Sequence, residues 1–487
     1  MRKGKRAGGM VGLSRQTIAT TEEPTPMHPS RSVLSQQQRI RHYAQASDAF
    51  CFFKQLTSPE LFDALEAALP EHRERLFPPT ETLSMFMAQA MKADRSCQSI
   101  VNEAAVTRLR HGLPSCSTKT GAYCKARQRM PLDMVSEMVT HTGQLIAEKV
   151  PERWRWHGRR VLLADGTTVT LPDTPANQAA YPQQSGQKMG LGFPICRIVG
   201  ITCLSSGAAL NAAMGKFKGK GSGEQALLRS MLDTFEMGDI LLGDAFYATY
   251  SLLAELPLRG VDAVFEQHGA RRRSTDFRRG TKLGSEDHLI TLNKPKIRPQ
   301  WMTEDQFKSI PDTLTVRELD IGGKVLVTTL LCPKTTPKSD LKALYKSRWN
   351  VELDFRNIKT TLGMETLSCK TPQMGEKEMW VYLLAYNLIR LIMLQSALLA
   401  DVLPRLLSFK HTLQLWLAWD RTARHASDEE SPEALLLLVA KQSVGNRPGR
   451  IEPRALKRRH KPYPLMTQTR AAARAHVQKY GHPKKVK

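Results

Sequence analysis

Four residues in the segment 341–362 have the types and the spacing of a site that binds phosphate groups. Tyr345, Arg348, Glu352 and Lys359 follow one another at intervals of three, four and seven residues. On one continuous helix, at about 100° per residue, their side chains fall in a single narrow arc. An apolar stripe lies beside this arc and is predicted to pack on a core; it consists of Leu344, Val351, Phe355, Ile358 and Leu362. An exposed helix with an Arg348–Glu352 ion pair would show the same pattern.

Two aspartates each follow a short apolar run that is predicted to be a buried strand. Asp165 ends the run 160–165, and Asp244 ends the run 239–244. Each has a simpler explanation, because Asp165 could open an Asp-Gly turn and Asp244 could cap the next helix. Together they place two carboxylates at the carboxyl ends of two strands of one sheet, where ligands bind in α/β folds.

The three acids predict a metal site. Asp165, Asp244 and Glu352 have no Cys or His near them in the sequence, and carboxylates alone suit a hard cation such as Mg²⁺ or Mn²⁺. Two such ions, roughly 3.5–4 Å apart, can activate the attacking oxygen and stabilise the leaving oxygen at a phosphodiester. Arg348 and Lys359 could hold neighbouring phosphates, and Tyr345 could add a hydrogen bond or stack.

The order Asp, Asp, Glu, with Glu352 inside Tyr-x-x-Arg-x-x-x-Glu-x-x-x-x-x-x-Lys, resembles bacterial insertion-sequence DDE transposases of the insertion-sequence-four family. The contexts Asp165-Gly-Thr and Gly-Asp244-Ala-Phe also resemble that family, and the resemblance covers roughly residues 80 to 465. It implies a ribonuclease-H-like core, two magnesium ions on the three acids, and a homodimer on paired transposon ends. It also implies that Tyr345, Arg348 and Lys359 grip phosphates near the cleaved end.

Trp301 is the candidate for one further role that the resemblance implies, which is to hold a flipped base. No motif marks this residue, and a core or surface Trp is the simpler explanation.

The function that this resemblance implies is cut-and-paste DNA transposition. The enzyme would bind terminal inverted repeats in double-stranded DNA, cleave them in a metal-dependent reaction and transfer them to target DNA. One alternative is a ribonuclease-H-like nuclease without strand transfer. The other is a non-catalytic regulator that only occupies the ends.

The elements that must position these residues form an α/β fold with a mixed sheet. We expect an arm or disorder over residues 1–45, a helical DNA-binding domain over 46–150, and the two parts of the catalytic core over 155–266 and 338–402. A β-rich insertion is predicted between them, over 267–337, and a helical region with a basic tail over 403–487. The segment 117–129 holds four basic residues that either contact DNA or form a solvated face; they are Lys119, Lys125, Arg127 and Arg129.

The charge of the chain points to a polyanion. Lys and Arg number 71 against 46 acids, which gives a formal net charge of +25, and the basic residues are dense after position 447. The most apolar stretch, 380–403, contains Asn387, Arg390 and Gln395, so we expect a buried helix and no membrane span. The eight cysteines form no Cys-x-x-Cys pair, and we expect reduced core residues in a cytoplasmic protein.

Overall fold

The computed structural model describes residues 76–77, 79–110, 112–219, 221–423, 432–445 and 466–481. The arm expected over residues 1–45, the first helix expected in the N-terminal domain, Cys51 and most of the basic tail lie outside these residues.

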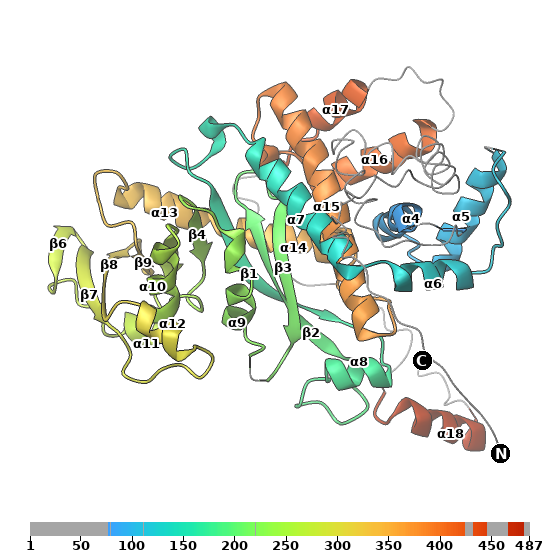
Figure 1. Ribbon diagram of the computed structural model, residues 1–487, viewed down its shortest axis with the longest axis horizontal. Coiled ribbons are helices and arrows are strands. Elements are labelled where there is room, and N and C mark those ends of the chain that lie inside the picture. The colour runs from blue at the N-terminus through green and yellow to red at the C-terminus, as the bar shows by residue number, and fades with distance from the viewer. Residues whose placement is uncertain are drawn as a thin grey trace, which may run out of the picture.

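A nine-stranded mixed sheet runs through the molecule in the order β3-β2-β1-β4-β5-β9-β8-β7-β6 (Figure 1). The neighbours β1, β4 and β5 are parallel, and every other pair of neighbours is antiparallel. This confirms the prediction of an α/β fold with a mixed sheet. The strands of the first part are β1 (Val161–Thr170), β2 (Ile195–Cys203), β3 (Ala209–Lys216), β4 (Ile240–Gly243) and β5 (Asp262–Glu266). Those of the second part are β6 (Thr281–Gly284), β7 (Asp287–Asn293), β8 (Thr313–Asp320) and β9 (Val325–Thr328).

One predicted strand end is wrong. Strand β1 does not stop at Asp165 but continues to Thr170. The reason is its antiparallel pairing with β2, which runs without interruption through the pair Asp165–Gly200 and on to the pair Thr170–Ile195. This continuous ladder keeps the Asp-Gly step extended, so no turn forms there.

Apolar cores lie on both faces of this sheet because successive side chains of a strand point to opposite faces. Val161, Leu163 and Val169 of β1 belong to the larger core, whereas Leu162 and Ala164 belong to the second core. The helices α4 (Pro79–Met91), α7 (Leu132–Glu148), α13 (Lys338–Ser347), α14 (Asn350–Arg356), α15 (Pro372–Ala400), α16 (Phe409–Ala423) and α17 (Pro432–Ala440) contribute to the larger core. The helices α9 (Glu224–Arg229) and α10 (Tyr250–Leu258) contribute to the second.

Helix α15 is the central helix of the larger core. It begins at Pro372, where the Thr371 side chain accepts the N–H of Met374, and it ends at Asp401, which adopts a left-handed conformation. By length and composition α15 is the one helix among the described residues that could cross a membrane, but 78% of its most apolar window is buried inside the protein. The buried helix expected over 380–403 is therefore confirmed.

Helix α7 covers the sheet together with α15, although the expected boundary at residue 150 placed it in the N-terminal domain. A Cβ atom on Gly143 would lie 2.2 Å from the carbonyl oxygen of Ala209 in β3, so the helix and the strand touch directly. The buried Asn387 side chain accepts the N–H of Ala209 and donates to the carbonyl of Val139, at 2.8 and 3.2 Å. Helix α7 is thus part of the layer that supports the strands of the site.

The strands predicted within 267–337 are present as β7, β8 and β9, and β6 was not predicted. They continue the main sheet, because β9 pairs with β5 through Phe265–Val327 and its neighbours. The remaining elements are α5 (Cys97–Arg110), α6 (Gly121–Arg129), α8 (Pro175–Ala180), α11 (Gly269–Arg272), α12 (Glu304–Ser309), α18 (Arg470–Tyr480), the π-helix η3 (Asn357–Thr361), and the short turns η1 (Glu152–Trp154), η2 (Leu232–Thr234) and η4 (Pro404–Leu406).

The expectation of core cysteines holds only in part. Three are buried, Cys196, Cys203 and Cys369, and all seven described cysteines are free. Cys332 is exposed, because it follows β9 in a loop.

Candidate active site and comparison with known proteins

Asp165 and Asp244 lie side by side on neighbouring parallel strands. The register pairs Leu163 of β1 with Leu242 of β4, so two residues further along Asp165 is level with Asp244. Parallel neighbours lie about 4.8 Å apart. Strand β4 ends at Gly243, and β1 therefore has no partner on that side at Asp165. The two carboxylates meet where the sheet opens, although only Asp244 follows the end of its strand.

Each of the two carboxylates is oriented by a backbone N–H. Asp165 Oδ1 accepts the N–H of Gly166 at 2.8 Å, and Asp244 Oδ1 accepts the N–H of Phe246 at 2.8 Å. Burial raises the pKa of Asp165 to about 6, and the charges of Asp244 and Glu224 act in the same direction. A buried carboxylate beside two other acids is stabilised by a cation, which is the electrostatic requirement of a metal ligand.

Arg348 connects the first aspartate to the predicted third acid. Its Nη1 lies 3.8 Å from Asp165 Oδ2, and its Nη2 donates to Glu352 Oε1 at 3.2 Å. The guanidinium group thus stands between carboxylates that the sequence places 187 positions apart. Glu352 remains partly open to solvent, with 36% of its side chain exposed.

The single helix predicted over 341–362 is wrong. The chain forms α13, α14 and the π-helix η3, and three N–H groups between the first two bond to carbonyls only three residues back. This tighter turn and the π-helix change the angle between successive side chains, so the expected common arc does not form. All five residues of the apolar stripe, from Leu344 to Leu362, are nevertheless buried.

Tyr345 is buried beside the site, where it bonds to Glu266, which is level with Asp244 on the adjacent strand β5. Its ring is 5% exposed, and its hydroxyl donates to Glu266 Oε2 at 2.9 Å. Glu266 ends β5 and also binds Lys324 Nζ at 2.6 Å. Burial would raise the pKa of Glu266, but the hydrogen bonds from Lys324 and Tyr345 outweigh it and lower that pKa. The hydrogen bond from Tyr345 therefore links α13 to β5 of the sheet.

Lys359 does reach the neighbourhood of Asp165. Its Nζ donates to Thr167 Oγ1 at 3.2 Å. Thr167 is two residues beyond Asp165 on β1, so both side chains point to the same face of the sheet. The structure thus brings Asp165, Asp244, Arg348 and Glu352 together and places Lys359 at the same face, while the Tyr345 hydroxyl is bound by Glu266 at the neighbouring strand end.

Glu224 is a fourth acid at this site that the sequence did not reveal. It begins α9 and packs over Gly166, where an added Cβ would lie 2.3 Å from Glu224 Cδ. Its partner is Arg197, at 3.5 Å, and burial raises the pKa of Glu224 together with the charge of Asp244. No local motif marks Glu224, because only the packing of α9 against β1 brings it here.

Trp301 lies in the segment before α12, with 40% of its surface exposed. The guanidinium carbon of Arg229 is 3.4 Å from the centre of its ring. Arg229 ends α9, the same helix that begins at Glu224, so Trp301 lies against the helix that reaches the acids.

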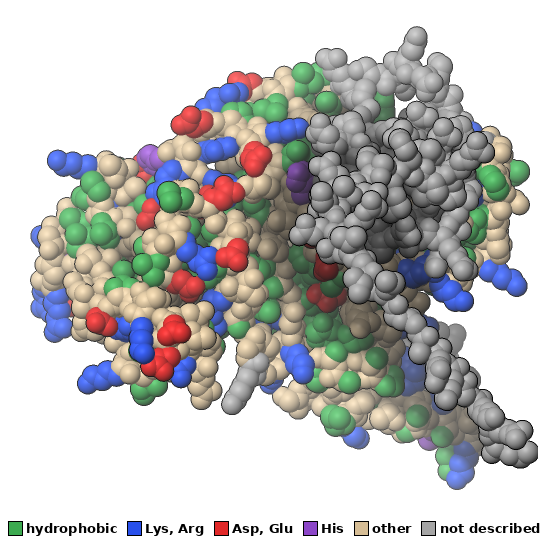
Figure 2. All heavy atoms as spheres, in the orientation of Figure 1, with side chains coloured by type: hydrophobic (Ala, Val, Ile, Leu, Met, Phe, Trp, Pro, Cys, Tyr) green, Lys and Arg blue, Asp and Glu red, His purple; other side chains and the backbone are tan. Residues whose placement is uncertain are grey.

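One of the four basic residues in the segment 117–129 is buried, so it neither faces solvent nor is available to DNA. Arg127 is 7% exposed, and its guanidinium lies over the rings of Phe86 and Tyr123, at 4.6 and 5.0 Å. Lys119 and Lys125 are exposed. On the face shown in Figure 2, Lys and Arg side chains are spread widely and intermingled with acids. The net charge of the chain is therefore not gathered into one patch on that face.

The acids fit a divalent cation by the chemistry of their donors, since Asp165, Asp244 and Glu352 offer only carboxylate oxygens. Across the described residues, no three Asp, Glu, His or Cys side chains are grouped closely enough to hold a metal ion. In this arrangement Arg348 provides the positive charge between Asp165 and Glu352.

Comparison with known proteins identifies the family of the chain. Residues 156–388, which contain all three acids, match the family model described as "Transposase DDE domain". The chain is 31% identical over 356 residues to the transposase InsG for insertion sequence element IS4 of Escherichia coli (strain K12), covering 70% of this chain and 77% of that protein. A solved structure of the piggyBac transposase synaptic complex with hairpin DNA is similar with a TM-score of 0.41 and 9% identity, covering 83% of this chain and 87% of that one. The chain therefore belongs to the IS4 family of DDE transposases, which cleave DNA and join it to a new site in reactions that depend on divalent metal ions.

Proposed function

We propose that Asp165, Asp244 and Glu352 are the three catalytic acids of this transposase and hold two divalent ions, Mg²⁺ or Mn²⁺. The observation that carries the proposal is the link through Arg348, which joins Asp165 to Glu352 while Asp244 is level with Asp165 on the next strand. When bound, the ions would activate the attacking oxygen and stabilise the leaving oxygen.

The protein's own basic residues would position the DNA. Arg348 is tied to two acids, and once cations take over that charge its guanidinium becomes free to bind a phosphate oxygen. Lys359 has a neutral partner, Thr167, and can hold a second phosphate along the same face of β1. Tyr345 would act through Glu266, by holding α13 in place, more than by touching DNA.

Glu224 is proposed as an additional acid of the site. It lies within electrostatic reach of both Asp165 and Asp244. In that position it would either help to hold a cation or keep Asp244 oriented. Trp301 remains a proposal for a base-stacking residue, supported by its exposed ring and by its contact with α9.

The larger organisation is also proposed. The ribonuclease-H-like core would comprise residues 155–266 and 338–402, with 267–337 as the insertion, 46–150 as a DNA-binding domain and 403–487 as a further DNA-contacting region. The enzyme would act as a homodimer on the terminal inverted repeats of an insertion sequence, by a cut-and-paste route, in the bacterial cytoplasm and without a membrane.

The test uses the full-length protein and duplexes that carry the element's own terminal inverted repeats. The wild-type protein with Mg²⁺ or Mn²⁺ should cut the ends and join them to a target plasmid. Asp165→Asn should bind the ends as the wild type does but neither cut nor join them. Retained cleavage by Asp165→Asn would contradict the assignment of this acid. Cleavage without joining by the wild type would favour the nuclease alternative, and binding without any cleavage would favour the regulator.

A further inference from the structure

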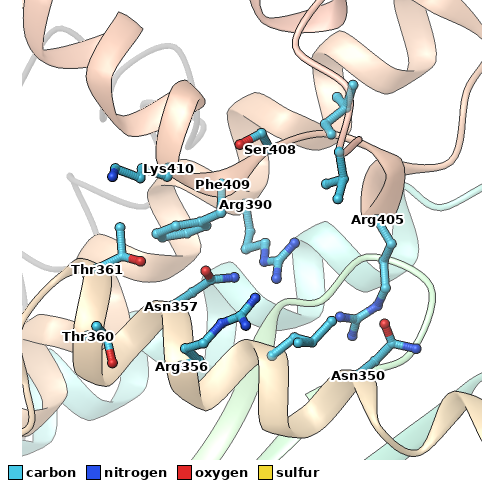
Figure 3. A pocket seen from close by; sticks show the side chains of 13 residues that line it. Asn350, Arg356, Asn357, Thr360, Thr361, Arg390, Arg405, Ser408, Phe409 and Lys410 are labelled. Atoms are coloured by element: carbon cyan, nitrogen blue, oxygen red, sulfur yellow. The ribbon is translucent and has the colours of Figure 1, made fainter. Parts of the chain in front are cut away.

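A second site lies beside the acids, in a cavity of about 560 Å³ between α14, the π-helix η3 and the start of α16 (Figure 3). This volume falls in the range of sites that bind small molecules or parts of larger ones. The residues that line it include four cations and no acid: Arg356, Arg390, Arg405 and Lys410.

Two of these cations are held rigidly by one buried acid. Asp354 accepts from Arg390 at 2.7 Å and from both Nη atoms of Arg405 at 2.8 and 2.9 Å. Thr202 completes the shell of Asp354 at 3.0 Å. Because a single carboxylate is paired with two guanidinium groups, this wall of the cavity has a net positive charge.

The other two cations are exposed. Within the residues that the structure describes, Arg356 and Lys410 make no ion pair. In Figure 3 the guanidinium groups of Arg356, Arg390 and Arg405 point toward the middle of the cavity, and Asn357 and Thr360 add polar groups from the helix. Charged and neutral hydrogen-bond donors around a space without acids are the chemistry of a phosphate-binding site.

The cavity is connected to the catalytic acids through α14. At about 100° per residue, Arg356 projects roughly 40° around the helix from Glu352, and Asn350 and Asn357 roughly 160° and 140°. Arg356 thus lies between the face that carries Glu352 and the face that lines the cavity. A helix with its side chains is about 10–12 Å wide, so one DNA duplex can contact both faces.

We propose that this cavity binds a backbone phosphate of DNA, in addition to the phosphate at the acids. The inference rests on the transposase function and adds a second phosphate site to it. The DNA is either the transposon end with its flank or the target, since both present the same phosphodiester.

The experiment compares two full-length charge-reversal variants. Arg356→Glu with Lys410→Glu alters the cavity, and Lys282→Glu with Lys296→Glu is the matched control on exposed lysines of the β6–β9 region. End duplexes and a target plasmid are the probes, and binding is measured over a range of salt concentrations. The cavity variant should lose at least tenfold in affinity for one of the two DNAs, and its salt dependence should fall by about one to two phosphate contacts.

The outcomes separate the two sources of the phosphate. Weaker binding of the end duplex assigns the cavity to the end and its flank, whereas normal end binding with weaker joining assigns it to the target. At saturating protein, the cavity variant should cut ends within about threefold of the wild type, which shows that the catalytic acids are intact. Equal losses of DNA affinity in the cavity variant and in the control would overturn the proposal. So would a loss of cleavage at saturation with normal binding of both DNAs.

Discussion

The two faces of α14 differ in how their charges are balanced. On one face Arg348 stands between the carboxylates of Asp165 and Glu352, so positive and negative groups compensate one another. On the other face Arg356 and Lys410 border a cavity whose lining contains no acid. Under the proposed function, metal ions would replace the guanidinium charge on the first face, whereas an anion from outside would neutralise the second. One short helix would therefore serve both the chemistry and the placement of the strand.

The largest expected effect comes from removing the acid of the first face. Glu352→Gln keeps the shape of the side chain but removes a charge that would stabilise metal ions in the transition state. We expect cleavage to fall by about 10³-fold or more, which corresponds to several kcal/mol. The measurement is single-turnover cleavage of end duplexes. Glu365→Gln, at an exposed position, is the matched control. Equal cleavage rates for the two variants would contradict the proposed role of Glu352.

The next effect comes from replacing Asp354, the buried acid that pairs with Arg390 and Arg405. Asp354→Asn would leave Arg390 and Arg405 buried without an anion, and losing the acid of a buried pair costs about 3–5 kcal/mol. We expect the free energy of unfolding, measured with urea, to fall by that amount. Asp233→Asn, which removes the surface partner of Arg259, should cost less than about 1 kcal/mol. If both variants lost less than about 1 kcal/mol of unfolding free energy, Asp354 would not be what holds Arg390 and Arg405 at the cavity.

A smaller change tests Glu224 on the first face. Gly166→Ala places a methyl group against the Glu224 carboxyl, whose flexible side chain can swing away. We expect cleavage to fall about tenfold, or about 1.4 kcal/mol, while the free energy of unfolding changes by no more than about 1 kcal/mol. Glu224→Gln should have a similar effect on cleavage. Full activity in both variants would remove Glu224 from the site.

Lys359 should contribute less, because it would bind phosphate and take no direct part in the chemistry. Lys359→Met keeps the length of the side chain but loses the charge next to Thr167. We expect end binding to weaken by about fivefold and the slope of log affinity against log salt to fall by about one. Lys342→Met, an exposed lysine of α13, is the control. An unchanged slope for Lys359→Met would mean that this lysine does not reach DNA.

The smallest effect distinguishes two roles of Tyr345. Tyr345→Phe removes the hydrogen bond to Glu266, which should cost about 1 kcal/mol of stability. Since the ring is buried and its hydroxyl is already bound by Glu266, cleavage and end affinity at saturating protein should stay near the wild-type values. A loss of DNA affinity with unchanged stability would instead support a direct contact between Tyr345 and phosphate.

The sequence by itself determined where most elements lie and which family the chain belongs to. The apolar runs ending near Asp165 and Asp244 became buried strands because a run of that kind can be satisfied only inside a sheet. The stripe from Leu344 to Leu362 was buried because the apolar face of a helix packs on a core. The proposal of Asp165, Asp244 and Glu352 as the acids of the site also came from the sequence, since the residues around Glu352 form one local motif.

Only the tertiary structure decided how these side chains are directed. The pairing with β2 carried β1 past Asp165, and the packing of α13 on the sheet brought the Tyr345 hydroxyl to Glu266 of β5. Packing also brought Glu224 to Gly166 and buried Arg127 between aromatic rings. Periodicity describes neighbours within one regular element, and it carries no information about a break in that element or about a partner far away in the chain. Those contacts depend on long-range packing, and they decide which of the predicted residues can reach DNA.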